Sequence, residues 1–217
     1  MKFRPSKYDR PAFGKMASQY GLVYYGTAIA GRDADYTPVR GITASPDQID
    51  ENYTTGYAGG HRVHLLQRSH NLYGAGGDTR RTWTICQADM NQALMPHIYL
   101  HNRNNDQGYG VSLISYLPMY ELDPASLSCP LVDSFVKQFA SYVLPEDIAR
   151  LEKVLTVDVQ NMLAAYFTDI DVEFNFKKVY LYSLAYPTHL VTLDKMLRIG
   201  VWLANKIDFT DWRTPTE

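Results

Sequence analysis

The chain has 217 residues, of which 46% are hydrophobic and 20% charged, which is typical of a globular protein long enough for one sizeable core. Its formal net charge of −2 at pH 7 argues against a domain that works by neutralising phosphates, so no nucleic-acid partner is expected. The two cysteines, Cys86 and Cys129, have neither zinc-like spacing nor the density of a disulfide scaffold, which favours reduced thiols in a cytoplasmic protein. The chain contains no run of about 18 apolar residues and no apolar segment after its basic start, so we expect neither a transmembrane segment nor a secretory signal in it.

The first elements expected along the chain are a helix and a strand. Residues 9–21 carry apolar side chains at helical spacing between Asp9, which can cap a helix, and Gly21, which can end one. The β-branched and aromatic run 22–29 predicts a strand that follows this helix. The stretch "SPDQ" at 45–48 has the capping-box pattern and predicts a brief helix or turn.

Residues 59–103 change to a strand pattern. Alternation along "RRTWTICQADM" predicts a strand with two different faces, and an antiparallel hairpin is the natural closure. The loop 70–79 contains three glycines but no phosphate-binding motif, so it is interpreted as the hairpin tip. Residues 104–130 have little periodicity and several prolines, which predicts an irregular crossing. We therefore expect a single α+β domain over 1–217, with a seam that allows two subdomains, 1–110 and 125–217.

The second half predicts short helices and one clear hairpin. The stretch 134–144 has a stripe that suits a helix or a bent strand, and Pro145 begins a second short helix. Thr156 can cap a third helix, whose Val159, Met162, Leu163 and Tyr166 are expected in the core. Residues 171–184 alternate as a hairpin, with Asp171 and Glu173 expected on its solvent side. A last amphipathic helix is predicted over 189–206. The fold class is therefore α+β, with antiparallel sheets from hairpins covered by short amphipathic helices.

Three stretches carry a resemblance to a known family: "RPAFGKMASQYGLVY", "MPHIYLHNR" and "DSFVKQFASYVLPEDIARLEKVLTVDVQNMLAAYFTDIDVEFNFKKVYLYS". Together they resemble bacterial proteins of unknown function from actinobacteria and candidate-phylum bacteria, some of which have membrane segments before the soluble part. The resemblance implies an α+β fold and a location near a membrane, and it implies no activity, substrate or cofactor. The chain departs from the family pattern at Thr156–Asp158, where the family has "TPD", and at His101, where the family often has Asp.

The histidines are the first candidates for a site. Five of the six lie between residues 61 and 101, namely His61, His64, His70, His97 and His101. Residues four apart on a strand share a face and residues three apart do not, so His97 and His101 can act together while His61 and His64 cannot. Zinc needs three convergent ligands and no H-E-x-x-H motif occurs, so no metal is assigned. The alternative is that His97, after Pro96, bonds the backbone where a strand begins.

The first hairpin offers a second candidate. It carries basic residues and nearby aromatic residues suited to an anionic ligand or a protein partner. This set comprises Arg62, Arg68, Arg80, Arg81, Tyr73 and Trp83. Charged flanks on a hairpin also serve to prevent edge-to-edge aggregation of sheets, so both interpretations stand. The predicted binding residues are this set together with His97 and His101.

Two functional hypotheses follow. The first is a non-enzymatic binding or scaffold domain that contacts a protein partner or a membrane-associated assembly, without a cofactor. The second is a metal-assisted hydrolase that uses His97, His101 and a histidine of the first hairpin. The first predicts an exposed aromatic or arginine-rich patch, and the second predicts a concave site where imidazoles meet a carboxylate.

Overall fold

The computed structural model describes residues 9–28, 39–44, 48–72, 79–92, 94–105, 114–115, 117–184 and 188–210. The chain divides into two compact units. Unit 1 consists of Met1–Asp89 and Tyr180–Val201, and unit 2 consists of Met90–Val179 and Trp202–Glu217. Each unit contains antiparallel strands and helices, which confirms the α+β prediction.

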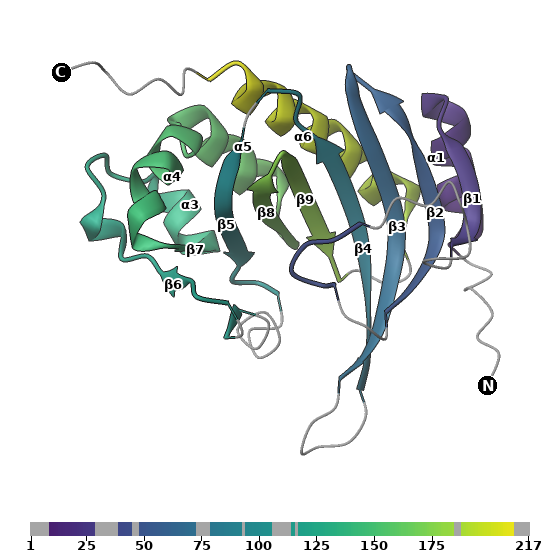
Figure 1. The fold of residues 1–217 in the computed structure, drawn as a ribbon, viewed down its shortest axis with the longest axis horizontal. Helices are drawn as coiled ribbons and strands as arrows, with labels where there is room; N and C mark the ends of the chain where they lie inside the picture. Colours follow the sequence, from purple (N-terminus) through teal and green to yellow (C-terminus); the bar gives the residue numbers. More distant parts are fainter. Residues whose placement is uncertain are drawn as a thin grey trace. The chain divides into compact units, whose positions relative to one another are not determined.

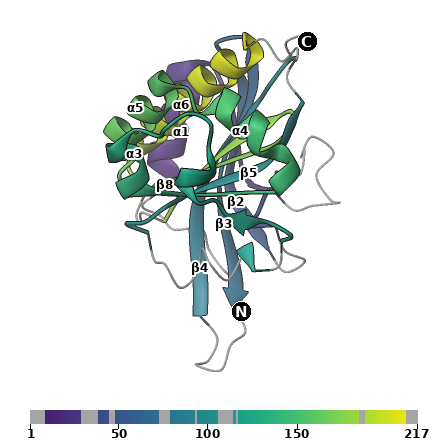
Figure 2. The ribbon, with the colours of Figure 1, turned by 90° about the vertical axis from the view of Figure 1, so that its left-hand side faces the viewer.

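Unit 1 is a sheet with helices packed on it. Its elements are α1 (Arg10–Tyr20), β1 (Val23–Ala28), β2 (Ile49–Ala58), β3 (His61–Leu72), β4 (Thr79–Asp89), most of β9 (Lys178–Ser183) and the first part of α6 (Leu190–Asp208). The strands run in the order β1-β2-β3-β4-β9, and the first three ladders are antiparallel (Figure 1). Figure 2 shows α1 beside α6.

The helix α1 matches its prediction except at its cap. Gly21 takes the left-handed conformation with φ 65° that a C-terminal glycine supplies at little cost. Asp9 is buried and its side chain does not cap α1. Its Oδ1 instead accepts a 2.8 Å hydrogen bond from the Thr188 backbone N–H, which precedes α6. The residue therefore joins the segment before α6 to α1, because a buried carboxylate is stable only where donors reach it.

The strand β2 was not predicted from sequence. Its burial covers six consecutive residues, Asp50 to Thr55, and several of these are polar. Their side chains bond inside the protein; for example, the Asn52 amide donates to the Gln67 side chain at 2.6 Å. The β2–β3 register shifts between Glu51 and Thr54, which interrupts a regular alternation of faces.

Gly200 lets α6 approach the sheet of unit 1 closely. A Cβ atom added at Gly200 would lie 3.4 Å from Leu181 Cδ1 and 3.5 Å from Cys86 Sγ. The face of the sheet that carries Leu181 and Cys86 is thus the face that α6 covers. Leu193, Met196 and Leu197 on α6 are buried, as the predicted apolar stripe requires.

Unit 2 has its own sheet and three short helices. Its elements are β5 (Met95–Asn102), β6 (Tyr120–Glu121), η1 (Pro124–Ser126), α3 (Asp133–Gln138), β7 (Phe139–Val143), η2 (Pro145–Asp147), α4 (Ile148–Val154), α5 (Val157–Tyr166), β8 (Ile170–Phe176), the start of β9 and the end of α6. The strands run in the order β8-β5-β7-β6. Figure 1 shows α3, α4 and α5 grouped beside β5 and β7, and Figure 2 separates α4 from the pair of α3 and α5.

The short helices follow from local signals, with one error. The stretch 134–144 was expected to form a helix or a bent strand, and it contains one of each, because α3 ends at Gln138 and β7 begins at Phe139. Thr156 caps α5 as predicted, because its side chain accepts from the Val159 N–H. Val159 and Leu163 are buried, but Tyr166 is exposed, so the prediction that Tyr166 belongs to the core is wrong. Tyr166 is the last residue of α5, so its side chain lies at the helix end.

The hairpin of β8 and β9 is confirmed, with its turn at residues 176–178. Phe176 has φ 54°, a left-handed conformation that is costly for a bulky residue. No helix in the described ranges is both long and apolar enough to cross a membrane. The predicted turn at 45–48 and most of the predicted loop 70–79 lie outside the described residues.

Candidate functional site

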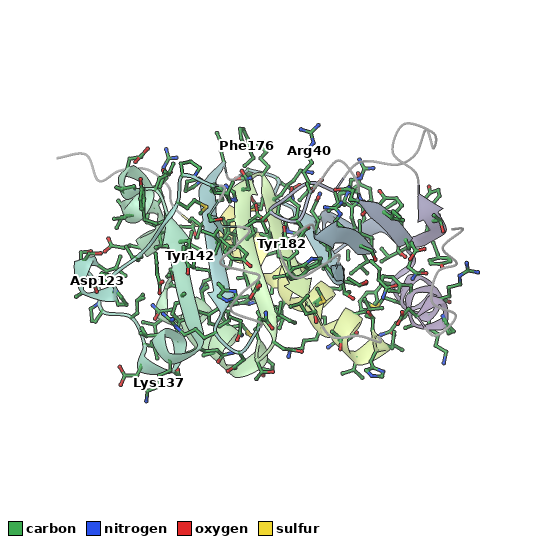
Figure 3. The ribbon with its side chains drawn as sticks, turned by 90° about the horizontal axis from the view of Figure 1, so that it is seen from below. Arg40, Asp123, Lys137, Tyr142, Phe176 and Tyr182 are labelled. Atoms are coloured by element: carbon green, nitrogen blue, oxygen red, sulfur yellow. The ribbon has the colours of Figure 1, made fainter. Side chains whose placement is uncertain are left out.

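The stretch "MPHIYLHN" forms β5, which places alternate residues of unit 2 on one face of the sheet. His97, Tyr99 and His101 share this face because side chains alternate along a strand. β8 brings a carboxylate to the same face, since Glu173 stands opposite Tyr99 in the ladder. β7 adds Tyr142, which stands opposite Tyr99 on the other side, with the two rings 6.4 Å apart (Figure 3).

Asp171 on β8 is the centre of a buried hydrogen-bond network. Its Oδ2 accepts a 2.7 Å hydrogen bond from the Tyr99 hydroxyl. Its Oδ1 accepts from the Asn102 backbone N–H at 2.7 Å and from the Asn105 amide at 2.8 Å. Three donors thus stabilise one buried carboxylate. Burial, followed by the neighbouring Asp171, raises the pKa of the Tyr99 hydroxyl well above its usual value, so Tyr99 stays a donor.

The second carboxylate, Glu173, is in hydrogen-bond contact with His97. The Glu173 side chain is 0% exposed, and its Oε1 lies 2.8 Å from His97 Nε2. His97 is partly exposed, so it shields the carboxylate on one side and meets the surface on the other. The predicted backbone bond of His97 is therefore replaced by a side-chain partner from β8. The expectation that Asp171 and Glu173 face solvent is wrong, because β5 covers both with donors.

His101 is buried beside Asp171, with Nδ1 3.4 Å from Asp171 Oδ1. Within the described residues neither ring nitrogen makes a hydrogen bond. The imidazole is stacked on Tyr99 with ring centroids 6.2 Å apart. The binding role of His101 stays a prediction.

The candidate histidines whose side chains the structure describes each have a different neighbour. Among the described residues, no group of three His, Cys, Asp or Glu side chains is placed to hold a metal ion. In unit 1, His61 Nδ1 lies 2.8 Å from the Asp89 carbonyl oxygen and His64 Nδ1 lies 2.9 Å from the Tyr53 hydroxyl. Each of these imidazoles is engaged within unit 1. His70 has no described side chain.

The basic set of the first hairpin does not form one surface. Arg68 is fully buried and Trp83 is 1% exposed, so the expectation of a surface is wrong for both. Arg68 donates through Nε and Nη2 to the two oxygens of Asp50, each at 2.8 Å, and this pairing ties β3 to β2. Arg62 is partly exposed on β3, and its binding role stays a prediction. Tyr73 and the side chains of Arg80 and Arg81 lie outside the described residues.

A hollow in unit 1 was not predicted from the sequence. It has a volume of about 500 Å³ and lies among the end of α1, the β2–β3 turn and the middle of α6. Its lining includes Tyr20, Tyr57, Gly59, Leu197, Arg198 and Val201. Tyr57 is 72% exposed beside this hollow.

Polar contacts hold Tyr20 and Arg198, two residues that line this hollow. The Tyr20 hydroxyl donates to Asp194 Oδ1 at 2.5 Å and accepts from Arg198 Nε at 3.1 Å. Arg198 Nε also lies 3.1 Å from Asp194 Oδ2. Burial, followed by the hydrogen bond to Asp194, raises the pKa of Tyr20. Tyr20 thus remains a neutral hydroxyl that joins α1 to α6 and leaves the Arg198 guanidinium at the rim.

The comparisons with known proteins give one structural likeness. No protein-family model matches the chain, and no curated protein matches it. The fold is similar to the crystal structure of the mycobacterial trehalose monomycolate transport factor A, TtfA, with a TM-score of 0.60 and 10% sequence identity. The likeness covers 97% of this chain and 99% of that chain, so the chain shares its fold with a transport factor along almost the whole length of both.

Proposed function

We propose that the chain is a non-enzymatic binding domain of a membrane transport assembly, where it contacts a protein partner. The observation that carries this proposal is the fold likeness to TtfA over 97% of this chain and 99% of that one. The likeness extends along almost the whole of both chains and is not limited to one motif. It supports a related role, although the two sequences are only 10% identical.

The chemistry of the buried groups in unit 2 also supports binding over hydrolysis. A hydrolytic zinc site keeps three protein ligands around an open position. His97 instead meets Glu173, while Asp171 is occupied by Tyr99 and Asn102. These contacts hold β5 against β8, which is a stabilising role.

The hollow of unit 1 is the surface that we assign to the protein partner. Exposed tyrosine and arginine are the side chains most often found as anchors in interfaces. Tyr57 and Arg198 supply both, and the half-buried Val201 adds apolar surface to the same hollow. The Tyr20 and Asp194 contacts hold Arg198 in place, which reduces the entropy that a partner must remove.

Site-specific photo-cross-linking in the source cell tests this proposal. A photoreactive amino acid at Tyr57 is expected to capture an integral membrane transport protein, and Val201→Asp is expected to abolish the product. The matched control is Tyr120, a tyrosine of β6 that is 66% exposed. It belongs to unit 2, whereas the residues of the hollow belong to unit 1. No product at Tyr57, or the same product at Tyr120, would contradict the assignment.

A second measurement separates the enzyme alternative. The double variant His97→Ala/His101→Ala is expected to lose stability but no activity. A hydrolytic activity that a chelator abolishes, and that the double variant lacks, would support the metal-assisted hydrolase instead.

A further inference from the structure

Three large hydrophobic side chains stand exposed at one end of unit 2. Leu94 is 61% exposed, Phe176 is 68% exposed and Phe209 is 83% exposed. They come from three different segments: the connection after β4, the turn between β8 and β9, and the end of α6. We call these three residues the apolar tip. Exposed side chains of this size cost solubility, so a grouped set of them indicates a contact surface.

Backbone hydrogen bonds hold the three segments together. The Met90 N–H donates to the Lys177 carbonyl oxygen at 2.7 Å, which joins the β4–β5 connection to the β8–β9 turn. Asn91 and Gln92 donate their backbone N–H groups to the two oxygens of Asp208, at 2.7 and 2.9 Å, which joins the same connection to α6. The ladder also places Met95, the residue after Leu94, opposite Phe176. The apolar tip therefore rests on a connected framework.

The backbone at Phe176 gives a second sign of function. Its φ of 54° lies in the left-handed region, where a bulky residue costs about 1–2 kcal/mol and glycine costs little. The turn thus keeps a strained phenylalanine whose ring lies at the outer margin of unit 2 (Figure 3). Strain of this kind persists where a side chain serves a contact.

The charge beside the apolar tip selects the kind of contact. Lys177 is exposed and Lys178 is half-buried directly after Phe176. Lysine ammonium groups next to exposed aromatic and aliphatic side chains complement an anionic lipid surface, where the apolar groups enter the headgroup boundary.

We infer that the apolar tip and Lys177 dock this chain onto an anionic membrane surface. Three exposed side chains are few for a stable protein interface, which needs about 800 Å² per partner, whereas a small apolar group beside a lysine suits the headgroup region of a bilayer. The inference deepens the membrane part of the proposed function and uses none of the residues of the hollow.

Vesicle co-sedimentation of the full chain tests the inference. The protein is expected to bind vesicles of phosphatidylcholine with phosphatidylglycerol more strongly than vesicles of phosphatidylcholine alone. Phe176→Ser is expected to lower binding about tenfold, because one buried aromatic side chain contributes about that factor. Lys177→Gln is expected to weaken binding to the anionic vesicles only, as is added salt.

Two further variants keep the result interpretable. Phe176→Gly relieves the left-handed strain, so it is expected to fold at least as stably as the wild type and still to lose binding. Val157→Ser and Val191→Ser change side chains that are 59% and 78% exposed elsewhere, and they are expected to leave binding unchanged. Absence of binding to both vesicles, or equal loss in the valine variants, would overturn the inference. So would a dimer that Phe176→Ser dissociates in sedimentation velocity without any vesicle binding. Cross-linking at Tyr57 is unaffected by either outcome, so the two proposals fail separately.

Discussion

The ion pair of Arg68 and Asp50 gives the sharpest stability prediction. Arg68 is 0% exposed, and Asp50 accepts two of its hydrogen bonds at 2.8 Å each. Asp50→Ala removes the carboxylate that pairs with Arg68 and leaves a buried cation whose remaining partners include the neutral oxygens of Val39 and Thr43. Breaking a buried ion pair in this way costs about 3–5 kcal/mol, and the remaining neutral acceptors favour the lower end.

The double variant Arg68→Met/Asp50→Leu provides the matched control. It removes both charges and keeps most of the volume, so it is expected to cost less than Asp50→Ala alone. Urea unfolding followed by far-ultraviolet circular dichroism measures both free energies. If Asp50→Ala costs less than about 1 kcal/mol, or if the cost of the double variant equals the sum of its two single variants, the reasoning fails.

Three further predictions concern α6 and the thiols. Gly200→Ala is expected to be tolerated, because the new Cβ lies 3.4 Å from the flexible end of Leu181, whereas Gly200→Leu is expected to cost about 1–3 kcal/mol in thermal unfolding by overpacking. A thiol reagent is expected to modify one cysteine in the native protein and two in urea, because Cys129 is exposed and Cys86 is buried with its pKa raised to about 12; two modified thiols in the native state would contradict this. The raised pKa means that the native state keeps the Cys86 proton when the unfolded chain has lost it, so stability is expected to fall as the pH rises from about 9 towards 12, and Cys86→Ala is expected to reduce that slope.

Elements with a regular apolar period were predictable, and those with buried polar residues were not. The α6 stripe and the β8–β9 hairpin follow from spacing alone, as does the Thr156 cap. The strand β2 was not predicted because its polar residues have the same pattern in the sequence whether they face water or bond within the core. Asn52 is one that bonds within the core.

The candidate sites depended on contacts between distant parts of the chain. The alternation around Asp171 indicated a wet face, and only the pairing of β8 with β5, about 70 residues earlier, reveals that Tyr99 and Asn102 cover it. The hollow could be predicted only from the pairing of β2 with β3 and the position of α6, which the sequence does not reveal. One local signal was available there, since Asp194 and Arg198 are four residues apart on a helix, the spacing of an ion pair.

The discontinuous make-up of unit 1 has a consequence for synthesis on the ribosome. Strands β1 to β4 are complete by Asp89, but β9 and α6 begin only after unit 2 supplies residues 90–179. At a translation rate of about 5–20 residues per second, that interval lasts roughly 5–20 seconds. During this interval α6 has not been synthesised, so the sheet face that packs near Gly200 is uncovered. Asp9 also lacks the hydrogen bond that the Thr188 N–H later donates to it. We therefore expect a chaperone to bind the nascent chain at this stage. A ribosome paused before residue 180 is expected to carry an intermediate that is prone to aggregation and to proteolysis.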